Sequence, residues 1–202
     1  MDARRRDLLR QSVALGAAVL VGRTALAQTP QGAAPAGAGL SEPGGRGDFD
    51  FFLGHWSVSA RRLRHRLTGD QTWEPVTGTT RVFQILQGAG NMDEDAFQLS
   101  GGVYVGGMLR LFDAQQNIWT TYGLDRDSGV VQPPLSGRFH AGRGEFYGDD
   151  TENGRPMKVR HLYFNNTPTA CRWEQAFSVD AGKAWETNWV IDFTRMASPA
   201  GG

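Results

Sequence analysis

Short segments in which apolar and polar residues alternate make up most of the chain from Asp48 to Met196. An alternation with a period of two residues is typical of a β-strand that has one buried face. Polar turns separate the segments, and none of them has the apolar spacing of an amphipathic helix. The pattern therefore predicts an all-β fold, an antiparallel barrel or sandwich, with strands at Trp56–Leu67, Thr79–Leu86, Val103–Phe112, Ile118–Leu124, Gly137–His140, Gly144–Asp150, Met157–Asn165, Cys171–Val179 and Trp185–Arg195.

The composition agrees with such a fold. The 202 residues include 27 glycines and 6 tryptophans, and 40% of them are hydrophobic. Turn-forming and aromatic residues are thus plentiful, as is typical of all-β proteins. A single cysteine excludes an intramolecular disulfide framework and a cysteine-rich zinc site.

The first 27 residues have the features of an export signal. Three arginines, Arg4 to Arg6, precede an uncharged run from Gln11 to Gly22, and Ala25-Leu26-Ala27 matches the small-residue pattern of a cleavage site. The apolar run is about a dozen residues long, against about 20 for a membrane-spanning helix, so we expect a signal peptide that is removed. The segment from Arg5 to Arg10 also resembles the bacterial twin-arginine signal, with the general secretory route as the alternative. Both routes predict a periplasmic or secreted protein, cleaved after Ala27.

The mature chain is predicted to be one domain with a leader and a tail. Residues 28–47 are mostly Gly, Ala, Pro and Gln, which is typical of a flexible leader, and residues 197–202 are predicted to be a disordered tail. Residues 48–196 are enough for a single domain with its own core. Removal of residues 1–27 takes five of the 21 basic and two of the 21 acidic side chains, which leaves a net charge of −3. We therefore expect no nucleic-acid partner, and no membrane span after the signal is removed.

One β-hairpin has a register that its turn predicts. Asn153-Gly154 favours a two-residue type I′ turn, which places Asp150 opposite Met157 and Phe146 opposite His161. The outer face then pairs Asp149 with Lys158, and the inner face carries Phe146, Gly148, Asp150, Met157, Val159, His161 and Tyr163.

A second hairpin is expected between Cys171 and Arg195. A three-residue loop at residues 180–182 would oppose Trp173 to Trp189 and Phe177 to Trp185. This register places Arg172, Glu174, Glu186, Asn188 and Asp192 on the outer face. The inner face would carry Cys171, Trp173, Gln175, Phe177, Trp185, Trp189, Ile191 and Phe193.

The two ends of the predicted domain resemble those of lipocalins and related calycins. Asp48–Leu53 is an apolar stretch behind a capping residue, suited to a single helical turn that Gly54 stops. Gly54-His55-Trp56 follows as the G-x-W found at the start of the first lipocalin strand, and Arg195 ends the last predicted strand. In lipocalins an arginine at that place packs across the tryptophan and helps to close the barrel.

Residues 48–195 as a whole are similar to an uncharacterised family of exported bacterial lipocalin-like proteins. The resemblance implies an antiparallel up-and-down barrel of about eight to ten strands with a short N-terminal helical turn, closed by Trp56 and Arg195. It also implies that the barrel handles a small ligand, but it brings no established reaction. The segments that carry it are Phe51–Trp56, Leu109–Asp113, Gly148–Pro156 and Trp173–Arg195.

The predicted inner faces offer a ligand site. Aromatic rings with a few polar groups suit a small apolar or aromatic molecule, bound inside the barrel without a cofactor. A solid aromatic core that includes a structural His161 is the alternative. The expected ligand-binding residues are Trp173, Gln175, Trp189, His161 and Tyr163.

The first strand adds a possible anion site. Arg62, Arg64 and Arg66 share the nominal face of Trp56, so an inward arginine could hold an anionic ligand group. An exposed strand face is the interpretation that we favour.

Two other functions stay open. His161 could act with Asp150 or Glu94 as acid and base in a cofactor-independent lyase, isomerase or hydratase. The acidic stretch Asn91–Asp95 that contains Glu94 is, however, more typical of a solvated loop. Alternatively, one of the 4 histidines could hold haem, and the sequence does not mark which one.

Neither a metal site nor a reactive thiol is expected. The histidine spacing fits no metal motif, and Asp125–Gly129 begins like a calcium loop but lacks its final glutamate. Cys171 is predicted to be buried and inert rather than a dimer cross-link. The sequence does not indicate which oligomeric state the protein adopts.

Overall fold

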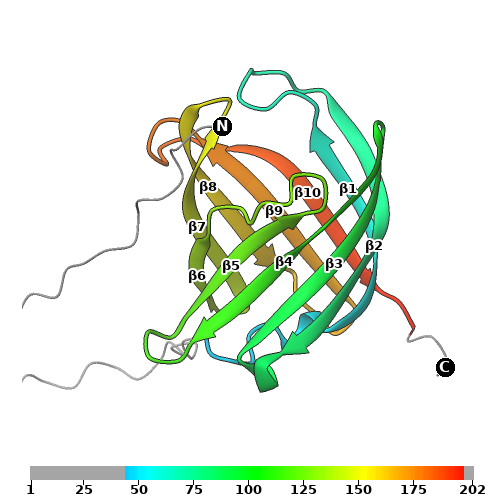
Figure 1. Ribbon diagram of the computed structural model, residues 1–202, viewed down its shortest axis with the longest axis vertical. Helices are drawn as coiled ribbons and strands as arrows, with labels where there is room; N and C mark the ends of the chain where they lie inside the picture. Colours follow the sequence, from blue (N-terminus) through cyan, green and yellow to red (C-terminus); the bar gives the residue numbers. More distant parts are fainter. Residues whose placement is uncertain (1–43, 198–202) are drawn as a thin grey trace, which may run out of the picture. The chain divides into compact units, whose positions relative to one another are not determined.

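A computed structural model describes residues 44–197, which form a β-barrel (Figure 1). The predicted signal peptide, residues 28–43 of the predicted leader and residues 198–202 of the predicted tail lie outside this described part. Two short 3₁₀ helices, η1 (Asp50–Phe52) and η2 (Leu86–Gly88), accompany the strands. The strands are β1 (Gly54–Leu63), β2 (Trp73–Ile85), β3 (Gly90–Leu99), β4 (Gly102–Asp113), β5 (Ile118–Asp125), β6 (Leu135–His140), β7 (Arg143–Glu152), β8 (Arg155–Phe164), β9 (Ala170–Ser178) and β10 (Glu186–Arg195).

Each strand pairs antiparallel with the next one along the chain, and β10 pairs with β1, so the sheet closes into a barrel. Figure 1 shows this closure where β10, in red, lies beside β1. Closure of this kind satisfies the backbone groups that an open sheet would leave at its edges. The predicted fold class, an antiparallel up-and-down barrel, is confirmed.

The prediction of a solvated loop at Asn91–Asp95 is wrong. This segment belongs to β3, in which Asn91 and Asp93 are buried while Glu94 is exposed on the opposite face. Acidic side chains usually indicate a loop because a buried carboxylate needs a partner. Here Arg110 of the neighbouring strand β4 supplies that partner, 2.5 Å from Asp93.

The register predicted for the β7–β8 hairpin is confirmed. Asp150 pairs with Met157 and Phe146 with His161, as a two-residue Asn153-Gly154 turn requires. Asn153 and Gly154 both have positive φ, of 52° and 77°. On the outer face, the Lys158 ammonium lies 2.6 Å from the carboxylate of Asp149.

The register predicted for the β9–β10 hairpin is wrong by two residues at Trp173, which pairs with Ile191 instead of Trp189. One residue of this shift is present next to the turn, where Phe177 pairs with Glu186, and the second arises from a bulge between Thr187 and Trp189. The extra residue is Asn188, which was predicted to be on the outer face and is instead fully buried. Uninterrupted alternation cannot predict such an insertion.

The shift next to the turn moves Trp185 away from its predicted inner position. Glu186, rather than Trp185, pairs with Phe177. The Trp185 ring instead lies 6.0 Å from that of Tyr147 and 4.7 Å from the Arg160 guanidinium, both on the outer face of the β7–β8 hairpin. The remaining residues predicted for the inner face of β9 and β10 do face inward.

The segment before β1 packs across one end of the barrel. The buried Phe49 ring makes edge-on contacts at about 5 Å with Trp119, Phe139 and Tyr163. Contacts with the barrel begin at Gly44, whose N–H donates to the Phe139 carbonyl, so the packed segment starts before the expected position. The expected helical turn is the 3₁₀ helix η1, which Asp48 does not cap. Asp48 accepts instead from the N–H of Gly45.

Trp56 and Arg195 lie together where β1 meets β10. Their Cα atoms are paired, and the Arg195 guanidinium carbon is 4.2 Å from the centre of the fully buried indole. Arg195 also donates to the carbonyls of Leu53 and Phe51, at 2.6 and 2.5 Å. Gly54 has a φ of +118°, and a Cβ there would lie 2.6 Å from the guanidinium, so only glycine fits this first position of G-x-W.

We expect Trp56 and Arg195 to contribute to stability as a coupled pair. Trp56→Ala should lower the free energy of unfolding by about 3–5 kcal/mol because removal of the buried indole leaves a cavity. Arg195→Ala should cost less, and a double-mutant cycle measured by chemical denaturation should give a coupling of about 0.5–2 kcal/mol. Arg172→Ala is the control, since its ion pair with Asp192 is exposed and worth at most about 1 kcal/mol. A coupling of zero between Trp56 and Arg195 would contradict the account.

Candidate functional site

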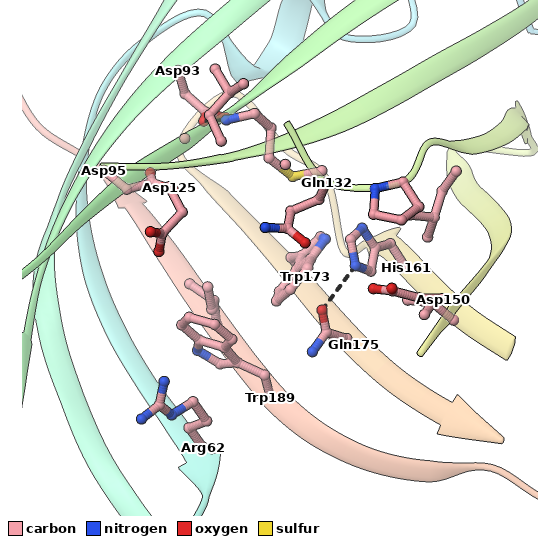
Figure 2. Close-up of a pocket in the computed structure, with 18 of the residues that line it drawn as sticks. Arg62, Asp93, Asp95, Asp125, Gln132, Asp150, His161, Trp173, Gln175 and Trp189 are labelled. Carbon is pink, nitrogen blue, oxygen red and sulfur yellow. Dashed lines mark hydrogen bonds between the residues drawn. The ribbon is translucent and has the colours of Figure 1, made fainter. Parts of the chain in front are cut away.

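The barrel contains a cavity of about 450 Å³ that is partly open to solvent. This volume lies within the range of small-molecule sites, roughly 300–1,000 Å³. Its aromatic wall comes from β3, β4, β9 and β10, and its polar groups come from several strands (Figure 2). The barrel interior is therefore only partly filled by side chains, and the alternative of a solid aromatic core is not what the structure shows.

A buried ion pair forms the floor of the cavity. Arg110 is 1% exposed, and its guanidinium donates to Asp93 at 2.5 Å and to Asn91 at 2.9 Å. It also donates to the Tyr163 hydroxyl at 3.2 Å, and the rings of Phe49 and Phe52 lie 5.2 and 5.3 Å from its carbon. Together with the Phe52 ring, which also lines the cavity, these contacts close the cavity toward the aromatic residues at the end of the barrel.

The charges of this floor are held by their own contacts. Burial disfavours the Arg110 charge, yet the Asp93 carboxylate outweighs that effect, and the pKa of Arg110 lies above its ordinary value. Burial raises the pKa of Tyr163 to about 12, against the influence of Arg110. Arg110 is therefore charged and Tyr163 neutral at physiological pH.

A chain of side-chain amides fixes the tautomer of His161. The Asn188 amide nitrogen donates to the Glu186 carbonyl, and its oxygen accepts from Gln175 at 2.9 Å. The side-chain oxygen of Gln175 lies 3.0 Å from Nε2 of His161 (Figure 2). Because a carbonyl can only accept, the chain assigns the proton to Nε2 and leaves a lone pair on Nδ1. The bulge that buries Asn188 is thus what orients His161.

His161 is neutral in this setting. Burial lowers its pKa to about 4, with a further lowering by the Arg110 charge, while the hydrogen bond to Gln175 acts in the opposite direction. Within residues 44–197, Nδ1 has no hydrogen-bond partner. A buried, neutral acceptor of this kind suits a donor group on a ligand.

Two indole N–H groups are also unsatisfied. The rings of Trp173 and Trp189 line the cavity with their centres 6.0 Å apart, and the Trp173 ring also lies 4.7 Å from that of His161. In the described part of the chain, neither Nε1 atom has an acceptor. Buried donors without a partner are uncommon in folded proteins and cost about 1–3 kcal/mol each.

A titratable carboxyl faces the cavity from β3. Asp95 accepts a hydrogen bond from the Thr80 hydroxyl at 2.6 Å. Burial, followed by the charge of Asp93, raises the pKa of Asp95 to about 8. The Tyr104 ring beside it stacks on Phe97 with the centres 6.0 Å apart. Burial, followed by the Asp95 charge, raises the pKa of Tyr104 to about 12.

The structure brings all five predicted ligand-binding residues to the cavity, namely Trp173, Gln175, Trp189, His161 and Tyr163. Tyr163 lies in the floor, bound to Arg110. Of the candidate acid–base residues, Asp150 lines the cavity. It pairs with Met157, four residues from His161 along β8 and thus about 13 Å away along the strand. Glu94 lies on the outer face of β3, so its assignment as a catalytic partner is corrected.

Sequence reasoning missed the residues from β3, β4 and the end of β5. Asp95 was assigned to a loop, Asp125 was considered only as the start of a rejected calcium loop, and Tyr104 was not considered as a ligand-binding residue. One signal was present, because Arg110 is a lone charge within the apolar run Met108–Phe112 and therefore requires a buried acidic partner nearby.

The structure also describes the cysteine and the residues that were considered as metal ligands. Cys171 is a buried free cysteine, and burial raises the pKa of its thiol to about 12, so it is unreactive. In residues 44–197, no three His, Cys, Asp or Glu side chains gather as a metal site would require. The same residues contain no helix that is long and apolar enough to span a membrane.

These features define a lipocalin-like, ten-strand barrel with an internal cavity. The chain matches no protein-family model and no curated protein. Among solved structures, the S-type phycobiliprotein lyase CPES from Guillardia theta is similar, with a TM-score of 0.51 and 12% sequence identity. The match covers 75% of this chain and 92% of that chain. A likeness at this identity shows the fold alone.

His161 should make stability depend on pH. Below the ordinary histidine pKa of 6.5, His161 is protonated in the unfolded chain but stays neutral in the folded chain down to about pH 4. Its contribution to the free energy of unfolding is therefore present above pH 6.5 and is lost as the pH falls toward 4. Between pH 7 and pH 4 the wild type should lose roughly 3 kcal/mol more of its free energy of unfolding than His161→Gln loses. His65→Gln, at a histidine whose side chain is 69% exposed, is the surface control for the substitution itself. Parallel pH profiles for the wild type and His161→Gln, measured by urea denaturation, would show that His161 is not buried as described.

Proposed function

We propose that this barrel binds a small molecule with a flat, aromatic or apolar body in its internal cavity. The observation that carries the proposal is the set of unsatisfied polar atoms in an aromatic cavity, the Trp173 and Trp189 N–H groups and His161 Nδ1. A solid core would leave these atoms unpaired at a cost of several kcal/mol in total, whereas a ligand with acceptors and a donor satisfies them.

The aromatic wall supports the proposed shape of the ligand. Trp173 and Trp189 are nearly perpendicular, at 79°, and Phe97 and Tyr104 lie about 6 Å from the Trp189 ring. Rings arranged at such angles offer both faces and edges to a flat molecule. The barrel of the solved phycobiliprotein lyase supports the fold, and the ligand chemistry proposed here rests on this chain's own residues.

A reaction in the cavity has weaker support than binding. The expected partners of His161 do not meet it, since Glu94 lies outside and the oxygen of Asp150 accepts from the N–H of Thr151. His161 donates its Nε2 proton to an amide rather than to a carboxylate. Among residues 44–197, no feature favours haem over an organic ligand without iron.

We also propose that the protein works outside the cytoplasm, as a periplasmic or secreted protein. The support is the charged head, the short apolar run and the Ala25-Leu26-Ala27 pattern at the start of the sequence. N-terminal sequencing of exported protein should then find Gln28 first. A chain that still begins at Met1 would contradict this.

Binding can be tested with 2-(1-naphthyl)ethanol, a neutral probe with two fused rings and one hydroxyl group. Isothermal titration calorimetry should show one binding site in the wild type. Trp173→Phe, which removes an N–H donor from the cavity, should weaken the affinity about fivefold, equivalent to roughly 1 kcal/mol. Trp185→Phe makes the same change on the outer face and should leave the affinity unchanged. No binding by the wild type, or equal effects of the two substitutions, would contradict the proposed site.

A further inference from the structure

Two carboxyl groups stand in one row across the sheet on one side of the cavity. Asp95 of β3 pairs with Gly106 of β4, and Gly106 pairs with Asp125 of β5. Neighbouring strands are about 4.8 Å apart, so the backbones of the two acids are about 10 Å apart with a glycine between them. Figure 2 shows Asp95 and Asp125 on the same side of the cavity, beyond Trp189.

The glycine in this row makes room for an aromatic ring. A Cβ at Gly106 would lie 2.1 Å from the hydroxyl oxygen of Tyr104, so any larger residue would displace the tyrosine. Tyr104 donates this hydroxyl to the Leu124 carbonyl at 3.3 Å, which leaves its ring beside the two acids. Carboxylates next to tyrosine and tryptophan rings form the environment that stabilises an ammonium group.

The basic side chains that line the cavity are already neutralised. Arg62 pairs with Glu74 at 2.8 Å, Arg66 with Glu152 at 2.9 Å, and Arg110 with Asp93 at 2.5 Å. In contrast, Asp95, Asp125 and Asp150 line the cavity without an ion pair to any basic side chain of residues 44–197. The inward arginines that could have held an anion are thus committed to protein carboxylates. The carboxyl groups that remain favour a positively charged ligand group, and such a group would draw the proton from Asp95, whose pKa burial raises to about 8.

We propose that the ligand of this cavity is a cationic aromatic amine, whose ammonium group lies between Asp95 and Asp125 against the Tyr104 ring. This inference rests on the proposed function and names its ligand class. The buried N–H of Trp173 and the buried Nδ1 of His161, which have no partner in the described chain, are on the far side from Asp125 and receive polar groups of the ring system. A cation beside Asp95 also offsets the burial that raises the pKa of this carboxyl.

A matched series of three probes tests the charge. The probes are 2-(1-naphthyl)ethylamine, 2-(1-naphthyl)ethanol and 3-(1-naphthyl)propanoate, which share the rings and differ in the charge of the end group. In calorimetric titrations at pH 7, the wild type should bind the amine about tenfold more tightly than the alcohol, and the propanoate most weakly.

Two neighbouring substitutions locate the effect. Asp95→Asn should remove most of the preference for the amine over the alcohol. Glu94→Gln, one residue away on the outer face, is the matched control and should keep the full preference. Asp125→Asn provides a second test of the same site in case Asp95→Asn does not fold, and it should also reduce the preference.

The outcomes separate the two proposals. Equal affinity for amine and alcohol in the wild type, or tighter binding of the propanoate, would overturn the cationic ligand while leaving the binding function intact. A preference for the amine that survives both Asp95→Asn and Asp125→Asn would overturn the assigned site. If neither the alcohol nor the amine binds, the proposed function itself fails.

Discussion

The ion pair between Arg110 and Asp93 is the interaction on which the interior of this barrel depends. Both groups are almost fully buried, and each has hydrogen-bond partners beyond the pair itself. A buried pair of this kind gains little stability over apolar residues, but removal of one partner leaves an isolated charge and costs about 3–5 kcal/mol. The pair therefore matters chiefly for what it specifies. It holds β3 to β4 in one register and ties both strands to β8 through Tyr163.

The floor that this pair builds divides the barrel into two parts with different roles. Below it, Phe49, Phe52 and Trp56 pack with Arg195 as a dense aromatic plug. Above it, the barrel interior has buried polar atoms without hydrogen-bond partners and enough space for a ligand. The bulge at Asn188 contributes on the opposite wall, because the buried amide it provides orients Gln175 and, through it, His161. Dense packing is thus concentrated at one end of the barrel and the cavity lies toward the other.

Local patterns in the sequence were sufficient where they obey simple alternation or a strong turn signal. Asn153-Gly154 predicted every pair of the β7–β8 hairpin, and G-x-W with a terminal arginine marked the two strands that meet at Trp56 and Arg195. Prediction failed where a distant partner changes the meaning of a residue. In the sequence alone, Asp93 and Asp95 indicate an exposed loop, and only the position of Arg110 beside them explains why they lie in a strand. Asn188 indicates an exposed position until the bulge is known. The predicted aromatic side of the cavity is therefore correct, and the acidic side could not be found by local pattern alone.

The central claim is that this barrel carries a small molecule above its polar floor. Native mass spectrometry of the exported protein, purified without denaturation, tests it most directly. The account predicts a noncovalent small-molecule adduct on the folded chain that disappears when the chain is unfolded and is reduced in Trp173→Phe but not in Trp185→Phe. A folded wild-type chain that shows only its own mass would contradict the claim.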